Sequence, residues 1–151
     1  MRVVLRGMEL AALRDCLAAI PDAEPAEPAA VARAIDDEVA YLASDEAMAS
    51  LARDTYWPKW RSPWWSMVLL DELGAAARIP GRAAAAMVAG LDALPLHTFP
   101  LRDEDWPAGA DRARDASCHC ALGCIDRVLV GCGVDVERAL PWIAAWYTRY
   151  Q

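Results

Sequence analysis

The chain has 151 residues, carries a formal net charge of −7 and is 56% hydrophobic. Its length fits one domain with a sizeable core, so we expect a single domain over residues 1–151. Lys59 is the one lysine, and the arginines are scattered along the sequence. Because binding to duplex nucleic acid requires clustered basic side chains, this composition argues against a nucleic-acid partner.

Neither a membrane span nor a signal peptide is predicted. The first twenty residues are partly apolar, but charged side chains interrupt them at Arg6, Glu9, Arg14 and Asp15, which breaks any continuous apolar stretch. The five cysteines are an odd number in a chain that is long enough to fold without disulfide bonds. Reduced thiols in a cytoplasm therefore fit better than a disulfide framework.

Apolar residues recur at helical spacing through most of the chain, and no segment alternates as a half-buried strand would. Short turns rich in glycine and proline separate the apolar segments. The sequence therefore predicts an all-α fold built of helical hairpins. The expected helices cover residues 7–19, 29–43, a short segment after Ser44, residues 63–73, 82–94 and 117–130, and a last segment after Asp135.

A few residues mark where these helices begin and end. Ser44 and Asp135 are expected to cap the helices that follow them, because a side-chain oxygen accepts an unpaired backbone N–H there. The Ser62–Pro63 pair is another start signal, and Gly74 is a stop signal. Pro141 lies inside the last apolar pattern, so the helix must either kink there or end and restart.

Residues 95–114 form a long polar stretch between two predicted helices and include the acidic run Asp103-Glu104-Asp105. Loops of this length inside a compact domain are often functional or mobile. We expect the acidic run to lie in a solvated loop, and the alternative is a metal-binding or acid-catalytic role.

Two predicted hairpins, over residues 63–94 and 117–151, are alike and carry a family resemblance. The segment Cys120-x-x-Gly123-x-x-x-Arg127-x-Leu129-x-x-x-Gly133, followed by Asp135-x-x-Arg138-Ala139-Leu140-x-Trp142-Ile143, resembles a repeat unit of the α/α-toroid superfamily. Lys59-Trp60-x-Ser62-Pro63-Trp64-Trp65, which leads into Leu69-Leu70-x-x-Leu73-Gly74, is similar to bacterial members of that superfamily. The superfamily includes squalene and terpene cyclases and protein prenyltransferases.

The resemblance covers residues 56–151 and implies a partial α/α toroid that is related to terpene cyclases or prenyltransferases. The chain departs from the family pattern in three respects. The turn that follows the glutamine of such repeats is absent after Gln151, no Asp-x-Asp-Asp motif is present, and the zinc triad of prenyltransferases has no counterpart. We therefore carry over no catalytic residue, and whether the protein is an enzyme stays open.

The tryptophans are the most informative candidates for a binding site. Aromatic walls suit apolar or cationic ligands, because the π face stabilises positive charge. The hypothesis is a Trp-lined apolar cavity for a small hydrophobic or isoprenoid-like ligand. Two alternatives are a Trp-rich core and a Trp-rich face that binds a partner chain, as in an interaction or scaffold module. The candidate ligand-binding residues are Trp57, Trp60, Trp64, Trp65, Trp142, Trp146, Cys120 and Cys124.

The segment that contains Cys118, His119, Cys120 and Cys124 brings together residue types that bind zinc. Neighbouring residues on a helix point about 100° apart, so the first three cannot converge on one ion unless the helix start is unwound. We therefore expect no metal, no cofactor and no disulfide bond here, and cysteines that pack as small hydrophobic residues. A zinc-binding domain is the alternative.

The last predicted helix has a wide apolar arc. It is formed by Trp142, Ile143, Trp146, Tyr147 and Tyr150. Soluble monomers avoid exposing so large an apolar patch. We therefore expect this helix to pack against a second copy in a two-fold homodimer, or against a further C-terminal portion.

Overall fold

The structure is a computed structural model. The chain divides into two units, residues 1–31 and 32–151. The helix predicted over residues 7–19 lies outside the described residues, so the single domain over 1–151 stays a prediction. Described are residues 27–151 except 59–60, 98–99, 101, 113, 117–118 and 151, and except the side chains of His119, Trp146, Arg149 and Tyr150.

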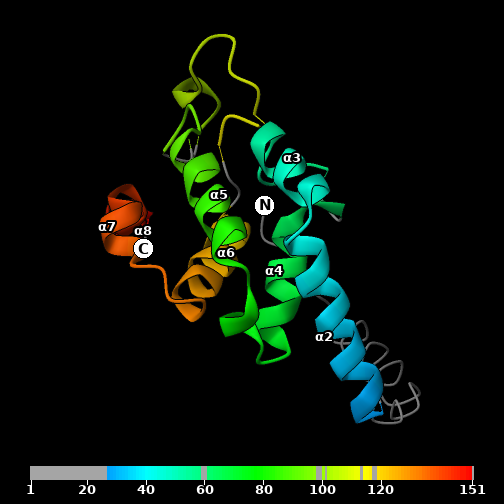
Figure 1. The fold of residues 1–151 in the computed structure, drawn as a ribbon. Helices are drawn as coiled ribbons and strands as arrows, with labels where there is room; N and C mark the ends of the chain where they lie inside the picture. Colours follow the sequence, from blue (N-terminus) through cyan, green and yellow to red (C-terminus); the bar gives the residue numbers. More distant parts are fainter. Residues whose placement is uncertain are drawn as a thin grey trace, which may run out of the picture. The chain divides into compact units, whose positions relative to one another are not determined.

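Every regular element in the described part of the chain is a helix, which confirms the predicted all-α class (Figure 1). Among these helices, none is both long and apolar enough to cross a membrane. The elements are α2 (Pro28–Leu42), α3 (Asp45–Arg53), α4 (Pro63–Glu72), η2 (Ala76–Arg78), α5 (Gly81–Asp92), η3 (Asp103–Asp105), α6 (His119–Gly131), α7 (Val136–Ala139) and α8 (Pro141–Tyr150).

The predicted helix ends are confirmed at the level of single hydrogen bonds. The Ser44 hydroxyl accepts the backbone N–H of Ala47 at 3.2 Å and so caps α3. Asp135 caps α7 in the same way by accepting the backbone N–H of Arg138 at 3.2 Å. Gly74 follows α4 with a φ of +70°, a left-handed conformation that favours glycine.

The break expected at Pro141 is an end and a restart. Leu140 leaves the helical region with φ −135° and ψ 62°, so α7 stops after four residues. Pro141 then occupies the first position of α8, where its missing N–H costs no helical hydrogen bond. The apolar stripe of the last segment is thus carried by two helices that meet at Leu140.

The short turn expected between α4 and α5 contains a further helix, the 3-10 helix η2. It packs on both α4 and α6, while α3 packs on α5 and α4 packs on α6. Figure 1 shows α3, α4, α5 and α6 gathered together in the second unit. No apolar period predicts η2, because three residues are too short to show one.

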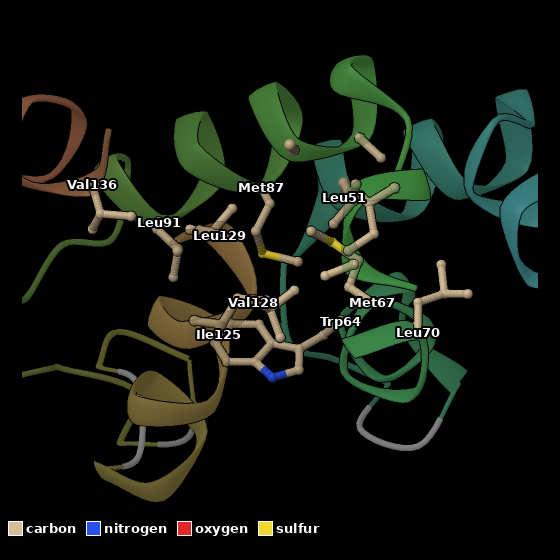
Figure 2. Close-up of a cluster of buried hydrophobic side chains, with 14 of the residues drawn as sticks. Leu51, Trp64, Met67, Leu70, Met87, Leu91, Ile125, Val128, Leu129 and Val136 are labelled. Carbon is tan, nitrogen blue, oxygen red and sulfur yellow. The ribbon is translucent and has the colours of Figure 1, made fainter. Parts of the chain in front are cut away.

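The core lies where α3, α4, α5 and α6 meet. Figure 2 shows its largest side chains pointing toward one another from separate helices. Burying each such side chain contributes roughly 1.5–3 kcal/mol to folding. The fully buried members include Leu51 of α3, Trp64, Met67 and Leu70 of α4, Met87 and Leu91 of α5, and Ile125 and Leu129 of α6.

Ion pairs link the helices at the surface of this core. Arg127 of α6 contacts Asp71 of α4 at 2.8 Å and also pairs with Glu72. Arg82 at the start of α5 contacts Asp45 of α3 at 2.9 Å. Apart from Asp71 these groups are largely exposed, so most of the pairs contribute little, and the apolar contacts beneath them decide the fold.

We predict that Leu70→Ala lowers the free energy of unfolding by about 2–5 kcal/mol, because it removes a fully buried side chain and leaves a cavity. The matched control is Leu69→Ala, one position earlier on α4, where 41% of the leucine is exposed. That change should cost about 1 kcal/mol or less. Urea denaturation of both variants measures the difference, and equal losses would contradict this packing.

The contact between α3 and α5 is close enough to require glycine at position 90. A Cβ atom at Gly90 would overlap the Cγ2 methyl of Thr55 and lie 3.7 Å from the backbone oxygen of Leu51. Thr55 is buried and branched at Cβ, so its methyl has little room to move. Gly90 therefore lets the end of α5 approach the segment that follows α3.

We predict that Gly90→Ala destabilises the protein, although alanine in a helix interior ordinarily gains about 1 kcal/mol over glycine. Overpacking of this kind costs roughly 1–3 kcal/mol. Thr55→Ser removes the obstructing methyl and should restore stability when combined with Gly90→Ala. Thermal melts of the double-mutant cycle test this. The control Gly123→Ala meets only an ordinary contact of 3.6 Å and should raise stability.

Candidate functional site

Two of the candidate tryptophans belong to the core. Trp64 is fully buried on α4, and Trp65 beside it is half-buried. Both rings pack on Tyr56: the Trp64 ring meets it edge-on with centroids 5.2 Å apart, and the Trp65 ring lies tilted at 6.4 Å. Figure 2 shows the Trp64 ring lying among the apolar side chains of the core. Trp64 therefore fills the interior instead of facing an open cavity.

The other candidate tryptophans are dispersed. Trp142 of α8 stacks on His97, with centroids 4.6 Å apart and planes 10° from parallel. Trp57 meets the edge of Tyr56 at 5.8 Å and lines a hollow of about 290 Å³ together with Arg53 and Arg114. Trp60 and the side chain of Trp146 lie outside the described residues.

The cysteines of α6 differ in their surroundings. Cys124 is half-buried, whereas Cys120 is exposed, contrary to the expectation that it packs as a small hydrophobic residue. The reason is its position in the helix: the buried face of α6 runs through Leu122, Ile125 and Leu129, and Cys120 lies off that face.

Within the described part of the chain, no group of three or more histidine, cysteine or acidic side chains is placed so that it could hold a metal ion. Cys118 and the side chain of His119, two members of the alternative zinc set, lie outside it. The described cysteines Cys120, Cys124 and Cys132 form no disulfide bond. The acidic run 103–105 forms the exposed helix η3 and pairs with Arg102 and Arg112.

A hollow of about 360 Å³ lies along α6, α7 and α8, and we call it the α6–α8 groove. The groove is open to solvent on one side. Its apolar lining consists of Val130, Val134, Val136, Leu140, Ile143 and Ala144. Its polar lining consists of Asp126, Asp135, Glu137 and Tyr147. The groove therefore combines an aliphatic surface from several elements with a small number of polar groups.

Local sequence signals build this groove. After α6, Gly133 adopts a φ of +88°, and the backbone N–H of Val134 bonds back to the oxygen of Leu129 at 2.9 Å. The chain thus reverses in a tight turn, and α7 packs on α6. The restart at Pro141 then places Ile143, Ala144 and Tyr147 of α8 along the same hollow.

Burial changes the acid–base behaviour of two groups in the groove. It raises the pKa of Asp126, because the ionised carboxylate loses water. Burial also raises the pKa of Tyr147, and the negative charges of Asp126 and Cys124 raise it further. Tyr147 therefore stays a neutral phenol near neutral pH and keeps its O–H as a hydrogen-bond donor.

The three carboxylates of the groove differ in their burial and in the groups that they contact. Asp135 caps α7 and lies 3.8 Å from Arg138. Glu137 is exposed. Asp126 is half-buried and has neither a cation nor a hydrogen-bond donor within the described part of the chain. A desolvated carboxylate without a compensating partner is unfavourable for folding.

A second hollow, of about 500 Å³, is lined by α5, by the turn after α6 and by Ala139 of α7. Small residues form most of its lining, including Gly81, Ala84 and Ala89. Val134 lines both this hollow and the α6–α8 groove. We take the groove as the candidate site because it alone of the two carries several polar groups beside its apolar lining.

The chain matches no protein-family model, and no curated protein or solved structure is significantly similar to it.

Sequence reasoning found part of this site and missed part. The apolar arc predicted for the last helix contributes Ile143 and Tyr147 to the lining of the groove. The sequence alone does not distinguish Asp126, because one aspartate on an amphipathic helix carries no distinctive pattern. Only its burial in the fold distinguishes it from other acids.

We predict that Asp126→Asn raises the free energy of unfolding at neutral pH. The folded-state pKa of this carboxyl lies above its unfolded value, so its ionisation costs stability as pH rises through that interval. The variant's advantage should be complete above the folded pKa and should vanish below the unfolded pKa of about 3.9. Urea denaturation between pH 3 and 8 measures this, and an advantage that grew on acidification would contradict it.

Proposed function

We propose that the protein binds a small hydrophobic ligand in the α6–α8 groove. The volume of about 360 Å³ lies in the range of known small-molecule sites. Such sites combine mainly apolar lining with a few polar groups, which is the composition of this groove. The observation that carries the proposal is this open aliphatic hollow, along which Val130 is 59% exposed.

A bound ligand would cover the aliphatic lining of the groove, and removing this surface from water would contribute favourable free energy to binding. Each apolar square ångström removed from water contributes roughly 25 cal/mol. The walls come from three helices and a tight turn, so the lining residues are held by the fold before a ligand arrives. A preformed site spends less of its binding energy on ordering side chains.

The α/α-toroid resemblance bears on the kind of ligand. If the chain is a partial toroid, an isoprenoid-like molecule is the natural candidate, because that family handles long branched hydrocarbons. The succession of α6, α7 and α8, each packed on the next, supports this reading. The proposal concerns binding, and it assigns no catalytic residue.

A homodimer is the second candidate, favoured by the exposed valine in the groove and by two exposed leucines on α4. Leu69 and Leu73 are 41% and 38% exposed and lie one helical turn apart. An apolar helix of a second copy would cover such surface. Light scattering across protein concentrations tests it, and a mass that stays monomeric at all concentrations would contradict it.

Binding of a neutral fluorophore, N-phenyl-1-naphthylamine, tests the ligand proposal. We predict saturable binding by the wild-type protein and at least about tenfold weaker binding by Ala144→Trp, which fills the groove and so removes about 1.4 kcal/mol or more of binding energy. The matched control is Ala145→Trp, an exposed neighbour on α8 that does not line the groove.

Ala145→Trp should bind the fluorophore as the wild type does. Circular dichroism melts of both variants establish that each is folded. Absence of saturable binding, or equal binding by Ala144→Trp and Ala145→Trp, would show that the groove is not the site.

A further inference from the structure

We infer that the ligand of the α6–α8 groove is a hydrophobic amine, whose protonated nitrogen binds the carboxylate of Asp126. This inference rests on the proposed function and adds the chemical class of the ligand to it. It comes from the distribution of charge around the groove, which differs from that of the rest of the described chain.

The groove has an acidic rim without a basic side chain in its lining; Arg138, just outside the lining, lies 3.8 Å from Asp135 and pairs with that carboxylate. Of its ten lining residues, Asp126, Asp135 and Glu137 are acidic and none is basic. Elsewhere in the described chain the arginines commonly neutralise nearby acids, as Arg78 does with Asp36 at 2.8 Å and Arg82 with Asp45 at 2.9 Å. An arrangement of carboxylates around an apolar hollow complements a ligand that is cationic at one end and apolar along its body.

Asp126 is the carboxylate best placed to receive the cation. Two other half-buried aspartates have partners: Asp71 pairs with Arg127 at 2.8 Å, and Asp54 accepts the backbone N–H groups of Tyr56 and Trp57 at 2.9 and 2.8 Å. Asp126 has none among the described residues, although burial penalises its charge. An ammonium group would supply the missing partner by a charge-assisted hydrogen bond.

The remaining polar groups fit the same ligand. Tyr147 keeps its phenol neutral, so its oxygen can accept a hydrogen bond from the ammonium group. Asp135 is already engaged in capping α7, and exposed Glu137 adds to the negative potential of the rim. Ile143 and Val130 offer aliphatic surface for the body of the ligand. An anionic amphiphile of the same shape would meet repulsion at the rim.

Three probes with one apolar body and different heads separate charge from hydrophobic binding. They are 4-phenylbutylamine, 4-phenylbutanol and 4-phenylbutyrate, titrated into ¹⁵N-labelled protein at neutral pH. The wild type should bind the amine at least about tenfold more tightly than the alcohol, which equals roughly 1.4 kcal/mol. The butyrate should bind most weakly. The largest amide shifts should fall at Asp126, Val130 and Tyr147.

Asp126→Asn should abolish the preference for the amine, measured as the ratio of the dissociation constants of the alcohol and the amine for the same variant. The matched control is Asp37→Asn on α2, an exposed residue whose substitution changes the net charge by the same amount. That variant should retain the full preference. Ala144→Trp should weaken the amine and the alcohol together, because it fills the space that both probes use.

The outcomes distinguish the assignment of an amine ligand from the underlying proposal that the α6–α8 groove binds a hydrophobic molecule. Equal binding of amine and alcohol, with both blocked by Ala144→Trp, would support the hydrophobic site and overturn the amine. Preference for the butyrate would overturn it as well. If the preference survived in Asp126→Asn, the assignment of the cation to Asp126 would be wrong. Absence of binding by all three probes would remove the proposed function and the inference with it.

Discussion

The burial of one face of α4 is the constraint on which the rest of this structure depends. Trp64, Met67 and Leu70 lie on that face, and all three are fully buried. Helices α3, α6 and η2 pack on α4, while α5 joins through α3 and through the shared core. The surface ion pairs add little to the stability of this packing, because exposed charges in water gain little free energy from pairing. The core therefore fixes α6, and α6 in turn provides one wall of the groove.

The groove exists because the last apolar segment is broken at Leu140. An unbroken helix through Pro141 would lose a backbone hydrogen bond and clash with the preceding turn. The chain instead forms two short helices that share one apolar stripe, and the stripe is only partly covered by α6. The same break leaves Asp126 beside aliphatic side chains, where its charge is poorly solvated. The poorly solvated charge of Asp126 thus lowers the stability of the fold at the candidate site itself, a pattern that is common in binding sites.

The sequence predicted the helices well and the site poorly, for different physical reasons. Helix caps are local, so Ser44 and Asp135 could be identified from a few neighbouring residues. The chemistry of the tryptophan rings makes them candidates for a binding site. Whether a ring such as Trp64 faces a cavity or the core, however, depends on which helices pack against it. Likewise, the pairing of Trp142 with His97 joins residues 45 positions apart, and no local pattern signals it. The short helix η2 has no period that a sequence could display.

The close approach of Gly90 and Thr55 has a consequence for how this protein can change over generations. The two positions are 35 residues apart in the chain, yet the space for one is set by the other. A lineage that first acquires a larger residue at position 90 passes through a poorly packed intermediate, whereas one that first loses the methyl at position 55 does not. The order of substitutions is therefore constrained. Related sequences should show residue 90 free to vary only where residue 55 has already become smaller.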